Sequence, residues 1–201
     1  TPIIVTLHLL GGMVTLSLLT WLWLRHRRDV AAVRAVDAER LLGYASFSLL
    51  VVFVQIALGG WVSSNYAALA CADFPTCKGA WLPPIDLQHA FQLVRDLGMT
   101  AQGALLPLEA LTAIHWVHRV GALVTLLVVG VLALRLIRIP ALARAGAFIA
   151  LVLTAQLSLG IANVLLSLPL PVAVAHNAVA ALLLLSLLML NFRLRKALSR
   201  A

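Results

Sequence analysis

The stretch that decides the fold lies at residues 114–134 and reads IHWVHRVGALVTLLVVGVLAL. After Arg119 this stretch contains no charged residue. A helix rises roughly 1.5 Å per residue, so about 20 apolar residues cross the hydrocarbon core of a membrane. The stretch is therefore long and apolar enough to span a membrane, and two histidines and an arginine lie at its start.

The composition of the whole chain agrees with this interpretation. Hydrophobic residues make up 63% of the 201 residues, charged residues make up 11%, and the mean hydropathy is +1.04. A water-soluble fold of this size cannot bury so much apolar surface. Apolar runs of spanning length occur five times, at about residues 2–24, 42–63, 110–134, 145–166 and 171–192.

These runs are expected to be helices, because backbone in lipid must satisfy its own hydrogen bonds. A β-barrel would show short segments of alternating polarity, whereas these runs are continuous. The sequence therefore predicts an all-α, polytopic membrane bundle with five transmembrane helices.

The positive charges predict the orientation of the bundle, because loops rich in Lys and Arg stay in the cytoplasm. Loop 64–109 contains only Lys78 and Arg95, together with four acidic residues, so we predict that it is extracytoplasmic and that the C-terminus is cytoplasmic. The other cations of the loops and tail lie in three segments on the opposite side: Arg25, Arg27, Arg28, Arg34, Arg40, Arg135, Arg138, Arg144, Arg193, Arg195, Lys196 and Arg200.

This distribution also explains the net charge of +8. The cations flank membrane spans and are not interleaved with exposed aromatic residues, which argues against a nucleic-acid partner. Contact with anionic lipid head groups is the expected use of these residues.

Internal similarity predicts repeated units. His8 and His176 each precede the first arginine that follows them by 17 residues, and the patterns Gln55–Gly59 and Gln156–Gly160 match. Such similarity in a membrane chain is typical of structural repeats. The alternative is that leucine-rich helices resemble one another by chance.

We therefore divide the chain into residues 1–25, the last helix of a preceding repeat, residues 26–41, a basic cytoplasmic loop, and residues 42–201, a complete four-helix unit. The chain starts at Thr1 inside an apolar run, without an initiator Met, and this favours a fragment or a processed chain.

Four histidines lie at a similar depth in the outer parts of the predicted helices: His8, His115, His118 and His176. An ionisable group inside a membrane is costly, so each is a functional candidate. Neutral imidazole is a common axial ligand of heme iron, and helical bundles hold cofactors between facing helices.

One histidine from residues 110–134 and one from residues 171–192 would complete a six-coordinate heme iron. His115 and His118 are three residues apart on one helix face, so either could be the ligand. Arg119 could neutralise a heme propionate. The alternative is that these histidines only form hydrogen bonds between helices.

Cys71 and Cys77 lie in the loop that is predicted to face the oxidising side of the membrane. That placement, with a turn assisted by Pro75, favours a disulfide over two free thiols. A zinc site would need further ligands, and the sequence has no second cysteine pair. The chain also lacks phosphate-loop, His-Glu-x-x-His and convincing Ser/His/Asp patterns.

Four stretches together resemble the heme A synthase family: residues 55–79, which contain both cysteines, residues 114–122, residues 174–177 and residues 8–12. The resemblance covers nearly the whole chain. It implies an eight-helix membrane protein with two pseudo-symmetric halves. Such a protein is an oxidoreductase that converts a methyl group of heme O to the formyl group of heme A for cytochrome oxidase.

The resemblance also implies roles for the candidate residues. His118 and His176 would bind the iron of a b-type heme, and Arg119 and His115 would lie beside that heme. His115 takes a position that a glutamate occupies in the family's other half. His8 would belong to the catalytic site that binds the iron of the substrate heme O, so this chain would carry the heme b half but not a complete reaction site.

Implied partners are heme O and heme A, heme O synthase, cytochrome oxidase assembly proteins and membrane lipid, with a homo-oligomer also conceivable. The implied location is the bacterial inner membrane. Two other functions stay open. One is a quinol-linked, bis-histidine b-type cytochrome, and the other is a non-catalytic heme carrier or assembly protein.

Overall fold

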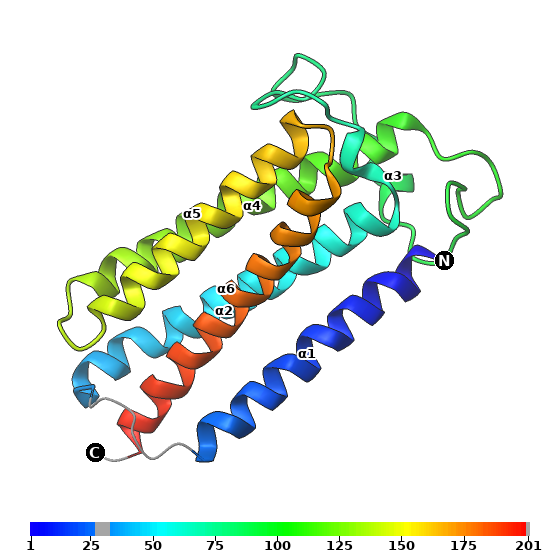
Figure 1. Ribbon diagram of the computed structural model, residues 1–201. Helices are drawn as coiled ribbons and strands as arrows, with labels where there is room; N and C mark the ends of the chain where they lie inside the picture. Colours follow the sequence, from blue (N-terminus) through cyan, green and yellow to red (C-terminus); the bar gives the residue numbers. More distant parts are fainter. Residues whose placement is uncertain (27–32, 200–201) are drawn as a thin grey trace. The chain divides into compact units, whose positions relative to one another are not determined.

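The computed structural model describes residues 1–26 and 33–199 of the chain, so Arg27, Arg28 and Arg200 of the predicted basic segments lie outside the described residues. The described chain is helical and contains no strand. In order, its elements are α1 (Pro2–His26), α2 (Ala35–Ser64), the 3₁₀ helix η1 (Ala67–Leu69), α3 (Leu87–Ala90), α4 (Leu108–Ile137), α5 (Ala143–Leu165) and α6 (Leu170–Leu198) (Figure 1).

Five of these helices, α1, α2, α4, α5 and α6, are long and apolar enough to cross a membrane. This confirms the predicted all-α, multi-pass fold, and each helix lies where the sequence predicts a span. The helix ends differ by a few residues. Helix α2 begins at Ala35, because Asp37 in its first turn forms an ion pair with Arg34 at 2.7 Å and an acidic residue there is favourable for the helix dipole.

The C-terminal end of α6 is extended in the same way. The helix continues past Phe192 to Leu198, and its last turn contains Arg195 and Lys196. Cations are favourable at the carbonyl end of a helix. Apolar run length therefore locates the membrane span, and polar residues carry the helix beyond it.

The contacts divide the chain into two units. Unit 1 contains residues 1–12, 55–123 and 157–176, and unit 2 contains residues 13–54, 124–156 and 177–201. Each of the five long helices contributes one segment to each unit.

Unit 2 is held together by leucines and by a few polar contacts between helices. Asn191 of α6 donates from Nδ2 to the Ala45 carbonyl of α2 at 3.0 Å, and its Oδ1 accepts from Ser46 at 2.8 Å. Helices α4 and α5 approach closely at Gly146, where a Cβ atom would lie 2.8 Å from the Ala133 carbonyl oxygen.

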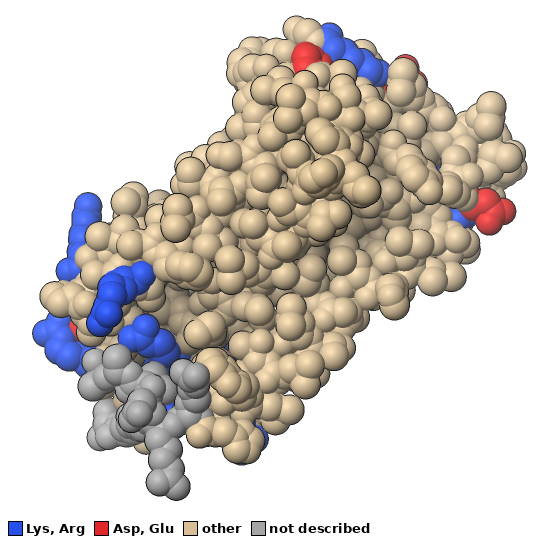
Figure 2. Space-filling view, viewed as in Figure 1, with Lys and Arg blue, Asp and Glu red and all other residues tan. Residues whose placement is uncertain are grey.

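Unit 2 also contains the described cations that the sequence assigns to the cytoplasm. Figure 2 shows Lys and Arg side chains gathered at one end of this unit, next to a broad uncharged surface. The described cations of unit 2 are Arg25, Arg34, Arg40, Arg135, Arg138, Arg144, Arg193, Arg195 and Lys196.

Unit 1 contains every candidate site residue. Its core includes Trp61, Ala110 and Ile114. The long segment between α2 and α4 is fixed to this core, since Trp61 donates from Nε1 to the Ala90 carbonyl at 2.9 Å and the buried Arg95 donates to Asn65. The loop therefore forms an ordered cover on the helix ends that contain the histidines.

Candidate functional site

Helix α2 holds His118 through a glutamine. Nε2 of Gln55 lies 3.0 Å from Nδ1 of His118 and donates to the His118 backbone carbonyl at 3.0 Å. One amide thus contacts both the ring and the backbone of the same residue. Gly121, one turn further along α4, leaves room for this amide, because a Cβ atom there would collide with Gln55 Oε1.

A glycine packs against each of the two predicted heme ligands. A Cβ atom at Gly59 of α2 would lie 3.2 Å from Cε1 of His118, and one at Gly160 of α5 would lie 3.1 Å from Cε1 of His176. The structure therefore places His118 and His176 in the same unit, with each ring seated against the backbone of a neighbouring helix.

His115 has different surroundings from His118. It is buried, with 5% of its surface exposed, and its Nε2 accepts a hydrogen bond from Nε of Arg119 at 3.3 Å. Its Nδ1 is buried without a hydrogen-bond partner among the described residues. The two histidines, which their spacing alone does not distinguish, thus have different partners in the structure.

Arg119 ties α4 to the cysteine loop. It donates to the Thr76 carbonyl at 2.7 Å and to the Cys71 carbonyl at 2.8 Å. Both acceptors lie within the ring that the Cys71–Cys77 disulfide closes, and both cysteines are buried. The guanidinium therefore connects His115 to the predicted disulfide loop.

Asp73 holds the same loop through three hydrogen bonds to residues 76–79. Its carboxylate accepts hydrogen bonds from Thr76 Oγ1 at 2.6 Å, from the Lys78 amide at 2.6 Å and from the Gly79 amide at 2.9 Å. The hydrogen bond from Thr76, followed by those from the backbone amides, holds the pKa of Asp73 well below its usual range. The carboxylate is therefore ionised at neutral pH.

His8 also belongs to unit 1, on α1, but its side chain is exposed. Helix α1 as a whole is sparsely covered, with 6% of its most apolar window buried. It meets α2 through a hydrogen bond of 3.0 Å between the hydroxyls of Thr6 and Ser64. The residues described around His118 and His176 do not include His8.

Sequence reasoning did not identify Gln55, Gly59, Gly121 and Gly160 as parts of the site. The matching Gln55–Gly59 and Gln156–Gly160 patterns were an available signal, because each glycine is now found against one of the two histidines. In the sequence, the two patterns indicate a repeat, and residues 55–79 also contribute to the family resemblance.

The residues present fit a heme. Two neutral imidazoles from different helices are suitable axial ligands, and the glycines allow each imidazole ring to approach a helix backbone closely. The described residues contain no group of three or more His, Cys, Asp or Glu side chains that could hold a metal ion. A porphyrin supplies four nitrogen ligands itself, so two histidines are sufficient for heme iron.

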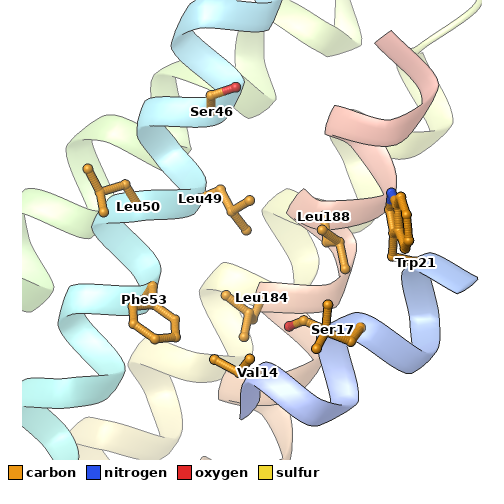
Figure 3. A pocket seen from close by; sticks show the side chains of 10 residues that line it. Val14, Ser17, Trp21, Ser46, Leu49, Leu50, Phe53, Leu184 and Leu188 are labelled. Carbon is orange, nitrogen blue, oxygen red and sulfur yellow. The ribbon is translucent and has the colours of Figure 1, made fainter. Parts of the chain in front are cut away.

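Unit 2 contains an apolar pocket of about 550 Å³ that is separate from the histidines. Figure 3 shows side chains of α1, α2 and α6 around it, among them Trp21, Phe53 and Leu188. Ser17 and Ser46 are the hydroxyl groups in its lining, and no ionisable side chain lines it. The pocket suits hydrocarbon and offers no acid, base or metal ligand.

Comparison with known proteins identifies the family of the chain. Residues 1–188 match the family model described as "Cytochrome oxidase assembly protein". A protein of Shewanella oneidensis named "Heme A synthase" is 41% identical over 191 residues, which cover 95% of this chain and 58% of that protein.

Two further relatives carry the same name. The protein of Methylobacterium radiotolerans is 32% identical over a match that covers 89% of this chain and 46% of that protein. The protein of Erythrobacter litoralis is 33% identical over a match that covers 89% of this chain and 49% of that protein. The chain thus spans about half the length of the curated relatives that it matches. With a family match over most of its residues and relatives of this name, the chain belongs to the heme A synthase family of cytochrome oxidase assembly proteins.

Proposed function

We propose that this chain is the part of a heme A synthase that binds a b-type heme, with His118 and His176 as the axial ligands of its iron. The observation that carries the proposal is the matched seating of these imidazoles in unit 1, since the Cβ positions of Gly59 and Gly160 lie 3.2 Å from Cε1 of His118 and 3.1 Å from Cε1 of His176. Two imidazoles at the same depth of a membrane bundle are expensive unless a partner uses them.

The reaction is the oxidation of a methyl group of heme O to the formyl group of heme A, and a bound b-type heme would supply a one-electron carrier. In this proposal, His118 and His176 would hold the iron, and Arg119 would lie beside the heme while it holds the cysteine loop through the Thr76 and Cys71 carbonyls. His115 accepts from Arg119 and orients it. His8 would serve the catalytic site that takes heme O, which needs residues beyond those of unit 1.

The proposal extends to the arrangement in the membrane. Residues 42–201 form a four-helix, heme-binding half, residues 1–25 supply a helix of the preceding half, and residues 26–41 are a cytoplasmic loop. Loop 64–109 is extracytoplasmic and the C-terminus is cytoplasmic. Support comes from the cations of unit 2 and the disulfide in unit 1, because disulfides persist on the oxidising side of a membrane. The bacterial relatives favour the inner membrane.

Two rival functions use the same heme site. A quinol-linked b-type cytochrome would carry electrons through the heme without changing another heme, and a heme carrier or assembly protein would bind heme without oxidising it. Family membership favours the synthase. Heme O synthase and oxidase assembly proteins are then the expected partners.

Analysis of the extracted hemes separates the synthase from the two rival functions. The coding sequence, together with any sequence upstream of it, is expressed in cells that make heme O but not heme A, and extracted hemes are separated by chromatography. A synthase yields heme A in these cells, and a His118→Ala variant yields none. Heme b in the protein without any heme A in the cells would favour the two rival functions over the synthase. The absence of both pigments would reject heme binding altogether.

A further inference from the structure

We propose that Gln55 is the positioning residue for His118, because its amide holds the imidazole at Nδ1 and so directs Nε2 toward a bound heme and tunes that ligand. The inference rests on the proposed function, since it takes His118 as an iron ligand. It adds Gln55 to the site as a residue that acts through its hydrogen bond to the His118 ring and does not contact the iron.

The first step is the way in which α2 holds the ring. Gln55 reaches Nδ1 at 3.0 Å, and Gly59, four residues later on the same face of α2, packs against Cε1 at 3.2 Å. Helix α2 therefore covers adjacent atoms on one edge of the imidazole. The two ring nitrogens lie at nearly equal distances from the Cβ position of Gly59, 3.8 Å for Nδ1 and 3.9 Å for Nε2. Gln55 contacts Nδ1, so Nε2 is the nitrogen that this glutamine leaves open for a ligand.

The second step is the anchoring of the amide itself. Gln55 Nε2 donates to the His118 carbonyl as well as contacting the ring, so the amide is fixed relative to α4 and cannot drift from Nδ1 without losing both contacts. Gly121 and Leu58 enclose it, because a Cβ atom at Gly121 would collide with Gln55 Oε1 and would lie 3.0 Å from Leu58 Cδ1.

The third step is the position of the ring proton. A neutral imidazole that binds iron through Nε2 carries its proton on Nδ1 and needs an acceptor there. In the structure the donor end of Gln55 faces Nδ1, which suits a ring with its proton on Nε2. Gln55 Oε1 is buried and has no hydrogen-bond partner among the described residues.

A half-turn of the Gln55 amide would give Nδ1 an acceptor and would give Oε1 a hydrogen-bond partner. When Nε2 of His118 becomes a ligand, its proton moves to Nδ1, with no net gain or loss of protons or electrons. The turned amide then presents Oε1 to the new Nδ1–H and gives up the Nε2 hydrogen bond to the His118 carbonyl. Glutamine can donate in one state and accept in the other, whereas leucine does neither and an ionised glutamate only accepts.

The experiment compares Gln55→Leu and Gln55→Glu with the unaltered protein, with Gln102→Leu as the matched control at an exposed loop position. Each protein is purified from membranes in detergent after expression with a heme supply. Heme retention, the low-spin spectrum and the midpoint potential of the heme are measured in alkaline buffer, so that a glutamate is ionised.

We expect Gln55→Leu to weaken heme retention by about 10- to 100-fold and to raise the midpoint potential, because an acceptor at Nδ1 increases the basicity of the ligand. We expect Gln55→Glu to retain heme and to lower the midpoint potential, because a carboxylate is a stronger acceptor. Gln102→Leu should match the unaltered protein.

The inference is overturned if both Gln55 variants keep the retention and the potential of the unaltered protein. It is also overturned if they only lower the yield of folded protein while the loaded fraction keeps its potential, since that is a purely structural effect. Failure of the proposed function looks different. In that case the unaltered protein binds no heme, or His118→Ala leaves the spectrum unchanged, and the inference falls with it.

Discussion

Gly59 of α2 and His118 of α4 are in contact so close that a single added carbon would disturb it, since a Cβ atom at Gly59 would lie 3.2 Å from Cε1 of the ring. The corresponding distance from Gly160 to Cε1 of His176 is 3.1 Å. Both contacts are tighter than ordinary van der Waals packing, so either the side chain or the helix has to move when the glycine is replaced.

Gly59→Val is expected to push the His118 ring away and to reduce the low-spin heme absorbance of the purified protein, and Gly160→Val is expected to do the same through His176. Gly12→Val is the control, because it places the same side chain in a helix where nothing lies within 4 Å of the Cβ position. Full heme content in both site variants would show that the glycines do not seat the ligands.

Gly146 provides a test of helix packing in unit 2. A Cβ atom there would lie 2.8 Å from both the Ala133 carbonyl oxygen and the Ile137 amide nitrogen. Backbone atoms cannot rotate aside, so Gly146→Ala should destabilise the protein by about 1–3 kcal/mol, the usual cost of overpacking. Thermal unfolding in detergent measures this effect.

The control for Gly146 is Gly43→Ala in α2, where nothing lies within 4 Å of the Cβ position. Alanine is the better helix former, so this variant should be neutral or more stable by up to about 1 kcal/mol. Equal unfolding temperatures for both variants would contradict the close approach of α4 and α5.

The cysteine loop gives a chemical prediction. Cys71 and Cys77 are joined in the structure, so alkylation of the unreduced protein should modify neither cysteine, and mass spectrometry should find them linked. Reduction should free both thiols and should increase protease cleavage between residues 71 and 77, because the covalent ring that closes this loop is then open. Two thiols that react without reductant would reject the disulfide.

The pKa of Asp73 predicts how the loop responds to pH. Hydrogen bonds lower the pKa of the Asp73 carboxyl group in the folded state. The stability that the ionised Asp73 contributes to the fold is therefore fully present above the ordinary aspartate pKa of about 3.9, and it is lost as the pH falls through the lower pKa of the folded state. The Lys78 and Gly79 amides should therefore stay protected from hydrogen exchange down to acidic pH.

Asp73→Asn should weaken that protection at neutral pH, because an amide offers one acceptor oxygen where the carboxylate uses two. Asp96→Asn, at an exposed position in the same long segment, should leave it unchanged. Exchange of Lys78 and Gly79 that does not differ between the two variants would show that Asp73 does not close the loop.

The sequence predicted the fold well because apolar run length has one physical cause, the thickness of the membrane. Every predicted span is found as a helix. The helix ends were harder to place, since they depend on polar contacts such as the pair of Arg34 and Asp37, which apolar pattern does not reveal.

The site was predicted only in part. His115 and His118 lie on one helix face, and their spacing gives no reason to choose between them. What separates them is contact with Gln55 and with Arg119, and the first of these joins residues 63 positions apart. The bonds from Arg119 to the loop carbonyls span 43 and 48 positions, so they too required the folded chain.

The most direct test of the central claim is the absorbance spectrum of purified His118→Ala and His176→Ala variants, with His115→Ala measured beside them. The account predicts that the unaltered protein shows the bands of a low-spin, six-coordinate b-type heme. Each of the two ligand variants should lose these bands, and His115→Ala should retain them. Unchanged spectra in both His118→Ala and His176→Ala would contradict the assignment of these histidines as heme ligands.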